Sequence, residues 1–247
     1  MFKLFQKRKS GREKFDFSLL RTDMHSHLLP GIDDGAATLE DSLFLIREMQ
    51  ALGYQKLITT PHIFWDMFRN TPEIIGEKLA LVRNAMKEQG FDIELHAAAE
   101  YFLDEHVEDL LKRKQPLLTI SGNKVLTEFS MMFPSLNTKD ILFELQMQGY
   151  QPIIAHPERY VYLQEDPGFY QDLKDSGCLF QLNILSIGGY YGRAVKELAE
   201  YLLEKNYYDL IGTDLHHSRH LDALRHVELT PALKKILDSG QISNHLL

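Results

Sequence analysis

Residues 23–35 read Asp-Met-His-Ser-His-Leu-Leu-Pro-Gly-Ile-Asp-Asp-Gly. If this stretch begins at the end of a strand, the period of two places Asp23, His25 and His27 on one face. Two imidazoles and a carboxylate on one face, with Asp33 and Asp34 just downstream, are typical of a metal site. A solvated polar loop would explain the same residues, so the prediction depends on further ligands elsewhere in the chain.

The rest of the chain alternates short apolar runs with amphipathic segments. The apolar, β-branched runs predict strands near residues 21–25, 54–60, 93–99, 124–128, 151–156, 178–183 and 207–213. Helix-capping residues and terminal glycines predict helices near residues 38–53, 71–90, 104–114, 138–149, 167–176, 190–205 and 230–239. Thr38, Thr71 and Thr138 are the expected N-caps of three of these helices. Strict alternation of strand and helix implies a parallel sheet, either closed or doubly wound.

Composition favours one domain. The chain has 247 residues, of which 44% are hydrophobic, and no linker interrupts the pattern after residue 21. We expect a basic tail over residues 1–18 and one α/β domain over residues 19–247. The tail is interpreted as a frayed, solubilising segment, with weak attraction to an anionic membrane surface as the alternative.

Charge and apolar runs limit the function classes. A net charge of −8 argues against a general nucleic-acid surface, but bound cations would still allow a phosphorylated substrate. No apolar stretch is long enough for a transmembrane segment, and the start lacks the apolar region of a signal peptide. We therefore expect a cytoplasmic protein.

The single cysteine also excludes several chemistries. Cys178 cannot form an internal disulfide or contribute to a cysteine-rich zinc site by itself. A cysteine-dependent phosphatase would need an arginine six residues after its thiolate, and that position is Ile184. We expect Cys178 to be a buried strand residue.

Histidines and acids follow the ends of the predicted strands. These residues are His25, His27, His62, Glu100, Glu128, His156, Asp214 and His216. In barrels built of strand–helix units, function lies at the carboxyl ends of the strands, so these side chains are expected to converge on a multi-metal site. Imidazoles and carboxylates without a thiolate suit Mn²⁺, Fe²⁺, Zn²⁺ or Mg²⁺. Ions that share a bridging carboxylate can generate hydroxide and bind an oxyanion, which is the chemistry of phosphoester hydrolysis.

The ordered motifs resemble those of the PHP (polymerase and histidinol phosphatase) superfamily. They are His25-Ser-His27, Gly-Ile-Asp-Asp34-Gly, Thr60-Pro-His62, Ala-Glu100, Glu128-Phe-Ser, Ala-His156-Pro-Glu-Arg159-Tyr and Asp214-Leu-His216. Within that superfamily the set is most similar to the manganese-dependent tyrosine phosphatases of bacterial capsule and exopolysaccharide loci, the CpsB/CapC type. The resemblance runs from about Arg21 to His226.

The resemblance implies a distorted (β/α)7 TIM-like barrel, the PHP fold, with a trinuclear site that holds Mn²⁺. One ion would be bound by His25, His27, Glu100 and Asp214. A second would share Glu100 and add Glu128 and His156, and the third would use Asp34, His62 and His216. Arg159 would contact the phosphoryl oxygens of the substrate.

The function implied is a metal-dependent protein tyrosine phosphatase that uses a hydroxide bridging two metals. Its substrate would be the C-terminal tail of a membrane-anchored bacterial tyrosine kinase of capsular or exopolysaccharide biosynthesis. The alternatives are a small-molecule phosphatase of the histidinol-phosphate type and a non-catalytic metal-binding PHP module. An amidohydrolase is disfavoured because the fourth predicted strand ends in Glu128 rather than in a lysine that could be carbamylated.

Other residues have two competing interpretations. Asp23 and Asp33 are expected to orient a ligand imidazole or a water, although Asp33 could equally be a turn residue. Arg219 is either a second phosphate contact or part of a solvated loop. Trp65 is either an apolar wall for the phosphotyrosine ring or an aromatic plug on the barrel rim. His96 is expected to be a hydrogen-bonded core histidine.

Overall fold

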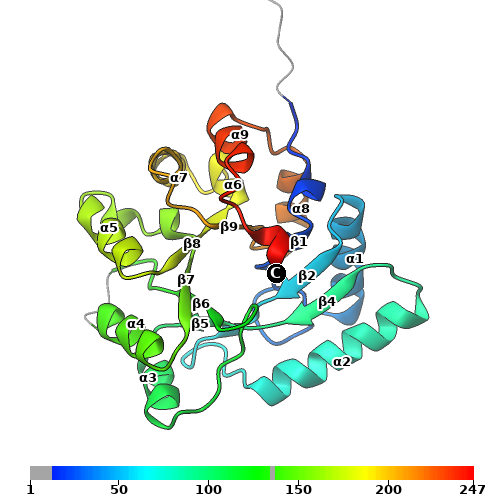
Figure 1. Ribbon diagram of the computed structural model, residues 1–247. Helices are drawn as coiled ribbons and strands as arrows, with labels where there is room; N and C mark the ends of the chain where they lie inside the picture. The colour runs from blue at the N-terminus through cyan, green and yellow to red at the C-terminus, as the bar shows by residue number, and fades with distance from the viewer. Residues whose placement is uncertain (1–12, 134–136) are drawn as a thin grey trace, which may run out of the picture.

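All seven predicted strands are present in this computed structural model, which describes residues 13–133 and 137–247 (Figure 1). They are β1 (Thr22–Asp23), β2 (Lys56–Thr59), β4 (Glu94–Ala97), β6 (Lys124–Glu128), β7 (Gln151–Ala155), β8 (Leu179–Asn183) and β9 (Leu210–Gly212). Two further short strands follow β2 and β4, namely β3 (His62–Ile63) and β5 (Glu100–Phe102).

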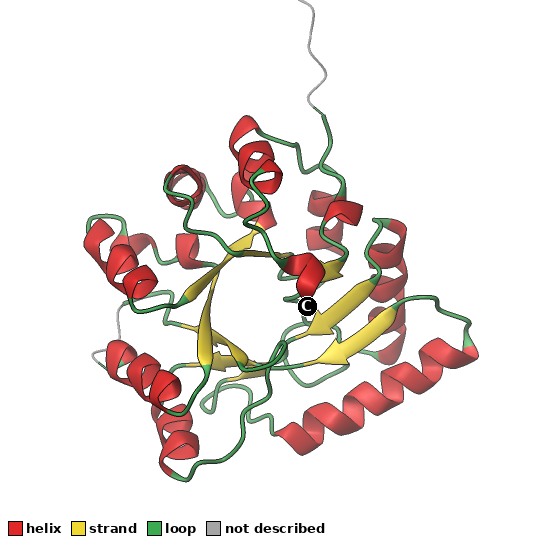
Figure 2. Cartoon of the chain, viewed as in Figure 1, coloured by secondary structure: helices red, strands yellow, loops and turns green. Residues whose placement is uncertain are grey.

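The strands form two parallel sheets that curve into one ring with helices outside (Figure 2). One sheet has the order β1-β2-β4, and the other has the order β3-β5-β6-β7-β8-β9. The division falls at Pro61, which cannot donate to a ladder, and at Ala98 and Ala99. A parallel bridge between Ser26 and Leu215 links the ends that follow β1 and β9. This arrangement confirms the prediction of a single parallel α/β domain.

Most helices have the predicted positions. They are α1 (Leu39–Ala51), α2 (Pro72–Glu88), α3 (Glu105–Lys112), α4 (Thr138–Met147), α5 (Pro167–Asp175), α7 (Arg193–Glu204) and α9 (Pro231–Asp238). Thr38 forms a reciprocal capping box with Asp41, and Thr71 caps α2 as predicted. The prediction for Thr138 is wrong, because Thr138 is the first helical residue and Asn137 is the N-cap.

Several short helices have no counterpart in the sequence-based prediction. They are α6 (Ile184–Ile187) and α8 (Ser218–Leu224), with the 3-10 turns η1 (Phe17–Leu19), η2 (Pro157–Arg159), η3 (Val161–Leu163) and η4 (Asn244–Leu246). The turn η2 follows β7 directly and carries Arg159. With three to seven residues each, these elements are too short to show the periodicity that reveals a helix in a sequence.

The C-terminus closes one end of the ring, where it lies in front of the strands in Figure 1. The side chain of Asn244 accepts from the backbone N–H of Ile211 and donates to the carbonyl of Thr22. Leu247 packs against a small apolar cluster inside the ring that includes Met24 and Ile58. Because these contacts lie at the amino ends of the strands, the carboxyl ends remain available for a site.

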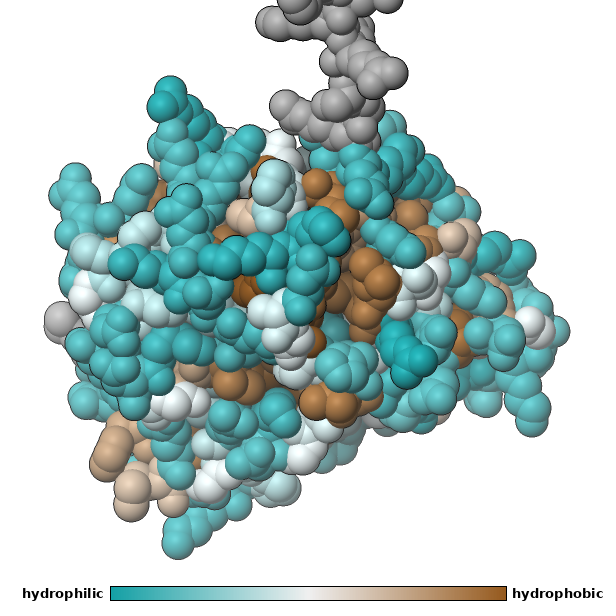
Figure 3. Space-filling model, turned by 45° about the horizontal axis from the view of Figure 1, so that its top comes forward, coloured by the Kyte–Doolittle hydropathy of each residue, from teal (hydrophilic) through white to brown (hydrophobic). Residues whose placement is uncertain are grey.

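The first described residues pack on the domain. Phe15 and Phe17 are buried in the main apolar core, and Lys14 pairs with Glu228 in an antiparallel bridge. Packed structure therefore begins before residue 19, and residues 1–12 of the expected tail lie outside the described residues. The surface in Figure 3 is mostly hydrophilic, with apolar side chains grouped near its centre. Across residues 13–133 and 137–247, none of the helices combines the length and the hydropathy that a membrane crossing needs.

Candidate metal centre

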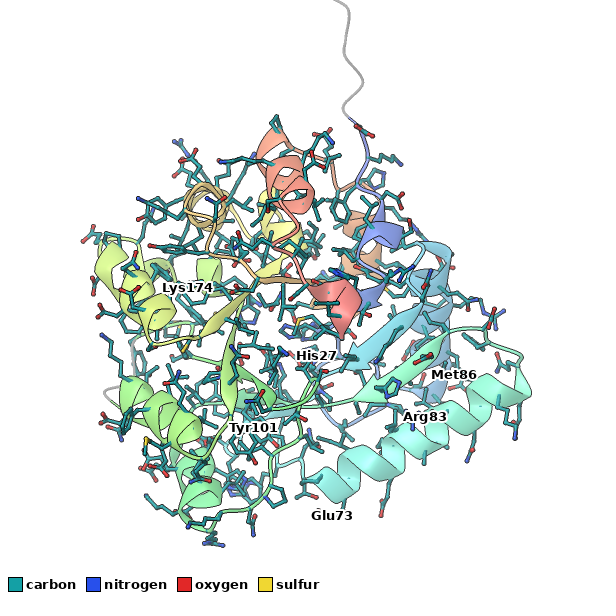
Figure 4. All side chains as sticks on the ribbon, viewed as in Figure 1. His27, Glu73, Arg83, Met86, Tyr101 and Lys174 are labelled. Carbon is teal, nitrogen blue, oxygen red and sulfur yellow. The ribbon has the colours of Figure 1, made fainter. Side chains whose placement is uncertain are left out.

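The candidate ligands lie where the strands end. Each follows, begins or ends a strand, except for one in the loop before α1: His25, His27, His62, Glu100, Glu128, His156, Asp214, His216 and the loop residue Asp34. Figure 4 shows His27 inside the ring, whereas Lys174 lies outside it. Side chains that are far apart in the sequence therefore meet in one place.

Glu100 lies at the middle of this group. Its Oε2 is 3.1 Å from Nε2 of His25, 3.4 Å from Nε2 of His27 and 3.3 Å from Nδ1 of His62. Its Oε1 is 3.2 Å from Nε2 of His156. The carboxylate is fully buried, so its charge interacts with these imidazoles and is not screened by water.

Three further carboxylates complete the group. Oδ1 of Asp214 is 3.3 Å from Nε2 of His25 and 3.4 Å from Nε2 of His27. Oδ1 of Asp34 lies 3.5 Å from Nε2 of His62 and 3.4 Å from Nε2 of His216. Glu128 is the fourth acid, with Oε2 3.6 Å from Nδ1 of His62.

Four groups of donor atoms, each within 4.8 Å of one another, can be drawn from these residues. They are His27-Asp34-His62-His216, His25-His27-Glu100, His25-His156-Asp214 and His62-Glu100-Glu128. The first contains the whole set expected for the third ion and adds His27. The groups differ from the sets expected for the other two ions. Asp214 groups with His25 and His156 instead of with His27 and Glu100, and Glu128 groups with Glu100 and His62 instead of with His156.

The buried acids have opposite electrostatic environments. Burial opposes ionisation of Glu100, but His25 and His62 hold its pKa well below the usual range. Burial and the negative charge of Glu100 raise the pKa of Glu128 well above the usual range. Two acids that repel each other in a buried site favour a bound cation, which would stabilise both ionised forms.

Unpaired donor atoms give a second test of whether a metal fits. Among the described residues, Nδ1 of His62 and Nδ1 of His156 are buried without a hydrogen-bond partner. Buried polar atoms are normally paired, and an imidazole nitrogen without a partner can serve as a metal ligand. The donor set of imidazoles and carboxylates therefore fits divalent cations.

Backbone geometry at the site is unusual. His156 has φ of 32° and Asp214 has φ of 51°, both in the left-handed region that non-glycine residues rarely adopt. Two glycines make room for ligands, because a Cβ on Gly35 would lie 2.2 Å from the carbonyl of His27, and one on Gly212 would lie 2.7 Å from Cβ of His25. Such local strain is typical of functional sites.

Hydrogen bonds from neighbouring residues fix the orientation of the imidazoles. Asp33 Oδ2 is 2.8 Å from Nδ1 of His27, and Oδ1 accepts from the N–H of Gly35. Asp33 therefore both orients an imidazole and stabilises the turn, as its two interpretations proposed. Gln181 Oε1 is 2.9 Å from Nδ1 of His25 and also accepts from the N–H of His156. These contacts leave the Nε2 atoms of His25 and His27 facing the acids.

Gln181 was not predicted from the sequence. Its signal is a polar residue within the apolar run of β8, where a buried amide needs partners. Asp23 differs from the prediction, because its carboxylate accepts from the N–H and the hydroxyl of Thr213 and not from an imidazole. Asp23 therefore joins β1 to the end of β9.

The two arginines that were predicted to contact phosphate, Arg159 and Arg219, lie in different parts of the structure. Arg159 lies beside the acids, and its Nη1 donates to Oδ2 of Asp214 over 2.9 Å. Its guanidinium also lies over the ring of Tyr191, 4.6 Å from the centroid. Asn183 donates to Asp214 and to the hydroxyl of Tyr191. Arg219 is exposed on α8 and is not among the described residues that line the site cavity.

A cavity of about 520 Å³ opens above the acids and imidazoles. Its apolar lining includes Phe64, Phe68, Phe102 and Phe129, together with methionines of two loops. Trp65, which was one candidate for an aromatic wall, stacks on His106 at 3.9 Å and lines neighbouring cavities instead. The aromatic lining of the site therefore consists of phenylalanines and Tyr191, without Trp65.

Three other histidines need comment. The prediction that His96 lies in the core is wrong, because 45% of its side chain is exposed and it contacts Glu94.

His217 and His220 line the cavity beside His216, and the ring of His217 caps α8 through the N–H of His220. Burial lowers the pKa of both rings, to about 4 for His220, which favours neutral imidazoles that add hydrogen-bonding groups to the site.

Two of the relatives found by sequence comparison are tyrosine-protein phosphatases. Tyrosine-protein phosphatase YwqE of Bacillus subtilis is 29% identical over 195 residues, which are 78% of this chain and 76% of that protein. Tyrosine-protein phosphatase CpsB of Streptococcus pneumoniae is 32% identical over 200 residues, covering 78% of this chain and 82% of that protein.

Solved structures show the same fold. One described as YwqE from Bacillus subtilis and CpsB from Streptococcus pneumoniae, unique metal-dependent tyrosine phosphatases, matches with a TM-score of 0.76 and 26% identity over 88% of this chain and 86% of that chain. An amidohydrolase from Mycoplasma synoviae matches with a TM-score of 0.50 and 13% identity, covering 95% of this chain and 87% of that chain, which shows only a shared fold. The model of the family "Capsular polysaccharide synthesis, CpsB/CapC" matches residues 21–237, and the chain belongs to this family.

Proposed function

We propose that this chain is a metal-dependent protein tyrosine phosphatase that hydrolyses phosphotyrosine in a protein substrate. The observation that carries the proposal is the convergence of imidazoles and carboxylates around Glu100 at the carboxyl ends of the strands. The family and its curated relatives, which are named tyrosine-protein phosphatases, support the same reaction.

The residues proposed to hold the cations are the nine candidate ligands: His25, His27, Asp34, His62, Glu100, Glu128, His156, Asp214 and His216. This number of donors exceeds what one ion can use, and the resemblance to the PHP superfamily supports three ions, preferably Mn²⁺, with Fe²⁺, Zn²⁺ or Mg²⁺ as alternatives. When bound, such cations supply an activated water and neutralise phosphoryl oxygens. Asp33 and Gln181 hold His27 and His25 with their Nε2 atoms toward these positions.

Arg159 is proposed to bind the phosphoryl group. Its guanidinium lines the site cavity, and Asp214 and Tyr191 hold it in place. A planar guanidinium can donate two parallel hydrogen bonds to phosphoryl oxygens, which favours the charge distribution of the transition state. Arg219 is a less direct candidate, since it lies on the exposed side of α8.

The cavity supplies the remaining recognition. Phe64, Phe102 and Phe129 form an apolar wall beside the acids and imidazoles, and a phenyl ring buried there is removed from water. The phosphate of phosphotyrosine would then point toward Arg159. This arrangement favours an aryl phosphate over a small, fully polar phosphate ester.

The family's role in capsular polysaccharide synthesis supports a more specific proposal. The substrate would be the C-terminal tail of a membrane-anchored tyrosine kinase of this system, which would place the enzyme on the cytoplasmic side of the membrane.

Turnover of a phosphotyrosine peptide and of histidinol phosphate, measured on the Mn²⁺-loaded protein, tests the proposed function. We expect a higher kcat/KM for the phosphotyrosine peptide, because only that substrate has a phenyl ring that can pack against the apolar wall. Hydrolysis of histidinol phosphate alone would instead support the small-molecule phosphatase. Absence of hydrolysis of both would support a non-catalytic metal-binding module.

A further inference from the structure

A second cavity adjoins the candidate active site. Its volume is about 860 Å³, and it lies between the loop after β3 and the first turns of α3. Four residues line both cavities, namely Phe64, Phe102, Phe129 and Ser130. A polypeptide whose phosphotyrosine fills the first cavity therefore has the second cavity directly beside its neighbouring residues.

Aromatic side chains form the walls of this second cavity. Phe64 stacks on Phe102 with ring centroids 4.1 Å apart, and Trp65 stacks on His106 at 3.9 Å. Aromatic faces attract cations through their quadrupole, and tryptophan does so most strongly. The guanidinium of Arg69 already lies over the Trp65 ring, 5.9 Å from its centroid, so the walls offer a basic side chain mainly apolar packing for its stem.

The charged residues of the lining are all acidic, and they stand beside neutral ones such as Leu103, Asn137 and Thr138. Among the described lining residues there is no lysine or arginine, and five carry a carboxylate: Asp66, Asp104, Glu105, Glu108 and Asp109. Glu108 and Asp109 are partly neutralised by ion pairs with Lys112 and Arg113 on the exposed side of α3. For Asp66 and Glu105, the described part of the chain offers no hydrogen-bonding or ion-pair partner.

The cavity is held in shape by Asp104. Its Oδ2 accepts from the N–H of Trp65, and its Oδ1 accepts from the N–H groups of His106 and Val107. These bonds fix the loop that carries Trp65 and Asp66 on the start of α3. A preformed cavity loses little conformational entropy when it binds a ligand.

We propose that this second cavity binds a lysine or arginine of the substrate chain that flanks the phosphotyrosine. The inference rests on the proposed phosphatase function and extends it to the choice of substrate sequence. The aromatic walls suit the stem of a basic side chain, and the unpaired carboxylates favour its charge and disfavour a glutamate or aspartate at the same place in the substrate.

Phosphopeptides that differ only at one position test the inference. The peptides carry Lys, Ala or Glu within a few residues of the phosphotyrosine, scanned on both sides, and kcat/KM is measured with Mn²⁺ at low ionic strength. At one or more positions, we expect the Lys peptide to exceed the Ala peptide by about fivefold, with the Glu peptide lower still. The difference should shrink at high salt, because exposed charges are screened.

A charge-neutralising pair of substitutions locates the effect. In Asp66→Asn/Glu105→Gln, the ratio of kcat/KM for the Lys and Ala peptides should fall close to one. The matched control is Glu77→Gln, which removes an exposed carboxylate from α2 away from both cavities and should keep the wild-type ratio. Equal turnover of the Lys, Ala and Glu peptides at every position, or a ratio that persists in the double variant, would overturn the inference.

Binding separates this inference from the proposed function. Peptides with a non-hydrolysable phosphonate in place of the phosphate are titrated into the Mn²⁺-loaded protein by calorimetry. Tighter binding of the Lys phosphonate supports the inference even if no peptide is hydrolysed, in which case only the proposed function fails. Hydrolysis with no preference in turnover or in binding contradicts only the inference.

Discussion

Arg159 donates a hydrogen bond from Nη1 to Oδ2 of Asp214 over 2.9 Å, while Oδ1 of the same carboxylate faces His25 and His27. One carboxylate therefore connects the proposed phosphate-binding arginine to the proposed metal ligands. Arg159 is also stacked on Tyr191, so its position depends on two neighbours rather than on its own flexible stem.

This pairing predicts the effect of replacing the arginine. In Arg159→Ala, we expect kcat/KM for a phosphotyrosine peptide to fall by about 100-fold or more, because a donor to the phosphoryl oxygens is lost. Arg159→Lys should recover part of the activity, since an ammonium keeps the charge but not the fork of donors. Metal content measured alongside should stay at the wild-type level. A kcat/KM within twofold of wild type in Arg159→Ala would contradict the assigned role.

Gln181 is predicted to control metal affinity without being a ligand. In Gln181→Leu, Nδ1 of His25 and the N–H of His156 lose their shared acceptor, so we expect metal affinity to fall by about 10- to 100-fold. Gln181→Glu keeps the acceptor and should retain more of the affinity. Competition with a metal-binding dye measures the change, and the unfolding midpoint of the metal-free proteins is the control. Equal affinity in Gln181→Leu and wild type would show that this hydrogen bond does not matter.

Two glycines give opposite predictions for the same substitution. A Cβ on Gly35 would lie 2.2 Å from the carbonyl oxygen of His27, so Gly35→Ala should lower the free energy of unfolding by about 1–3 kcal/mol. Gly76 lies inside α2, and an added Cβ would meet no atom within 4 Å beyond the backbone of its own helix. Gly76→Ala should therefore raise the free energy of unfolding by about 0.5–1 kcal/mol.

Urea unfolding of the two variants and of wild type checks this contrast. Gly35→Ala should also weaken metal binding, because His27 must move, whereas Gly76→Ala should leave it unchanged. Similar stability changes in both variants would show that the close approach at Gly35 is not important.

Glu158 predicts a pH dependence of stability. It is buried on η2, where it accepts from Ser186, Tyr208 and the N–H of Asn183, and burial raises its pKa from 4.5 to about 7. Below about pH 4.5 the carboxyl is protonated in both the folded and the unfolded chain. As the pH rises through about 7, the unfolded chain ionises first, so the stability that the protonated group contributes is lost. The loss corresponds to about 3 kcal/mol.

Comparison with Glu158→Gln isolates this group, since glutamine does not titrate. The free energy of unfolding of the metal-free proteins is measured in urea from about pH 4 to about pH 8. Wild type should lose about 3 kcal/mol more than the variant over this range. Parallel pH profiles for the two proteins would show that the folded state does not shift the pKa of Glu158.

The sequence predicts the fold and the candidate ligands for one shared reason. Apolar runs mark the strands, and polar residues such as His62, Glu128 and His156 stand where those runs stop. In a parallel closed sheet all such positions lie at one end. The predicted residues were therefore brought together even though no contact between them is visible in the sequence.

Other features could not be predicted in this way. The breaks that separate β3 from β2 and β5 from β4 depend on how the ring of strands closes. A local sequence pattern gives no information about ring closure. Gln181, Asn183 and Tyr191 are neutral residues that matter through their partners on other strands or loops. His96 has the same parity as Glu100, but the break between β4 and β5 ends that alternation, so its side chain is partly exposed.

Metal content and phosphatase activity, measured on the same preparations, test the central claim most directly. The protein is loaded with Mn²⁺, Fe²⁺ or Zn²⁺, or treated with EDTA, and Glu100→Ala and His156→Ala serve as site variants. We predict more than one bound ion per chain, hydrolysis of phosphotyrosine that EDTA abolishes and metal restores, and loss of both in the variants. A protein that binds no metal and hydrolyses no phosphotyrosine under any of these conditions would contradict the proposed metal centre and its function.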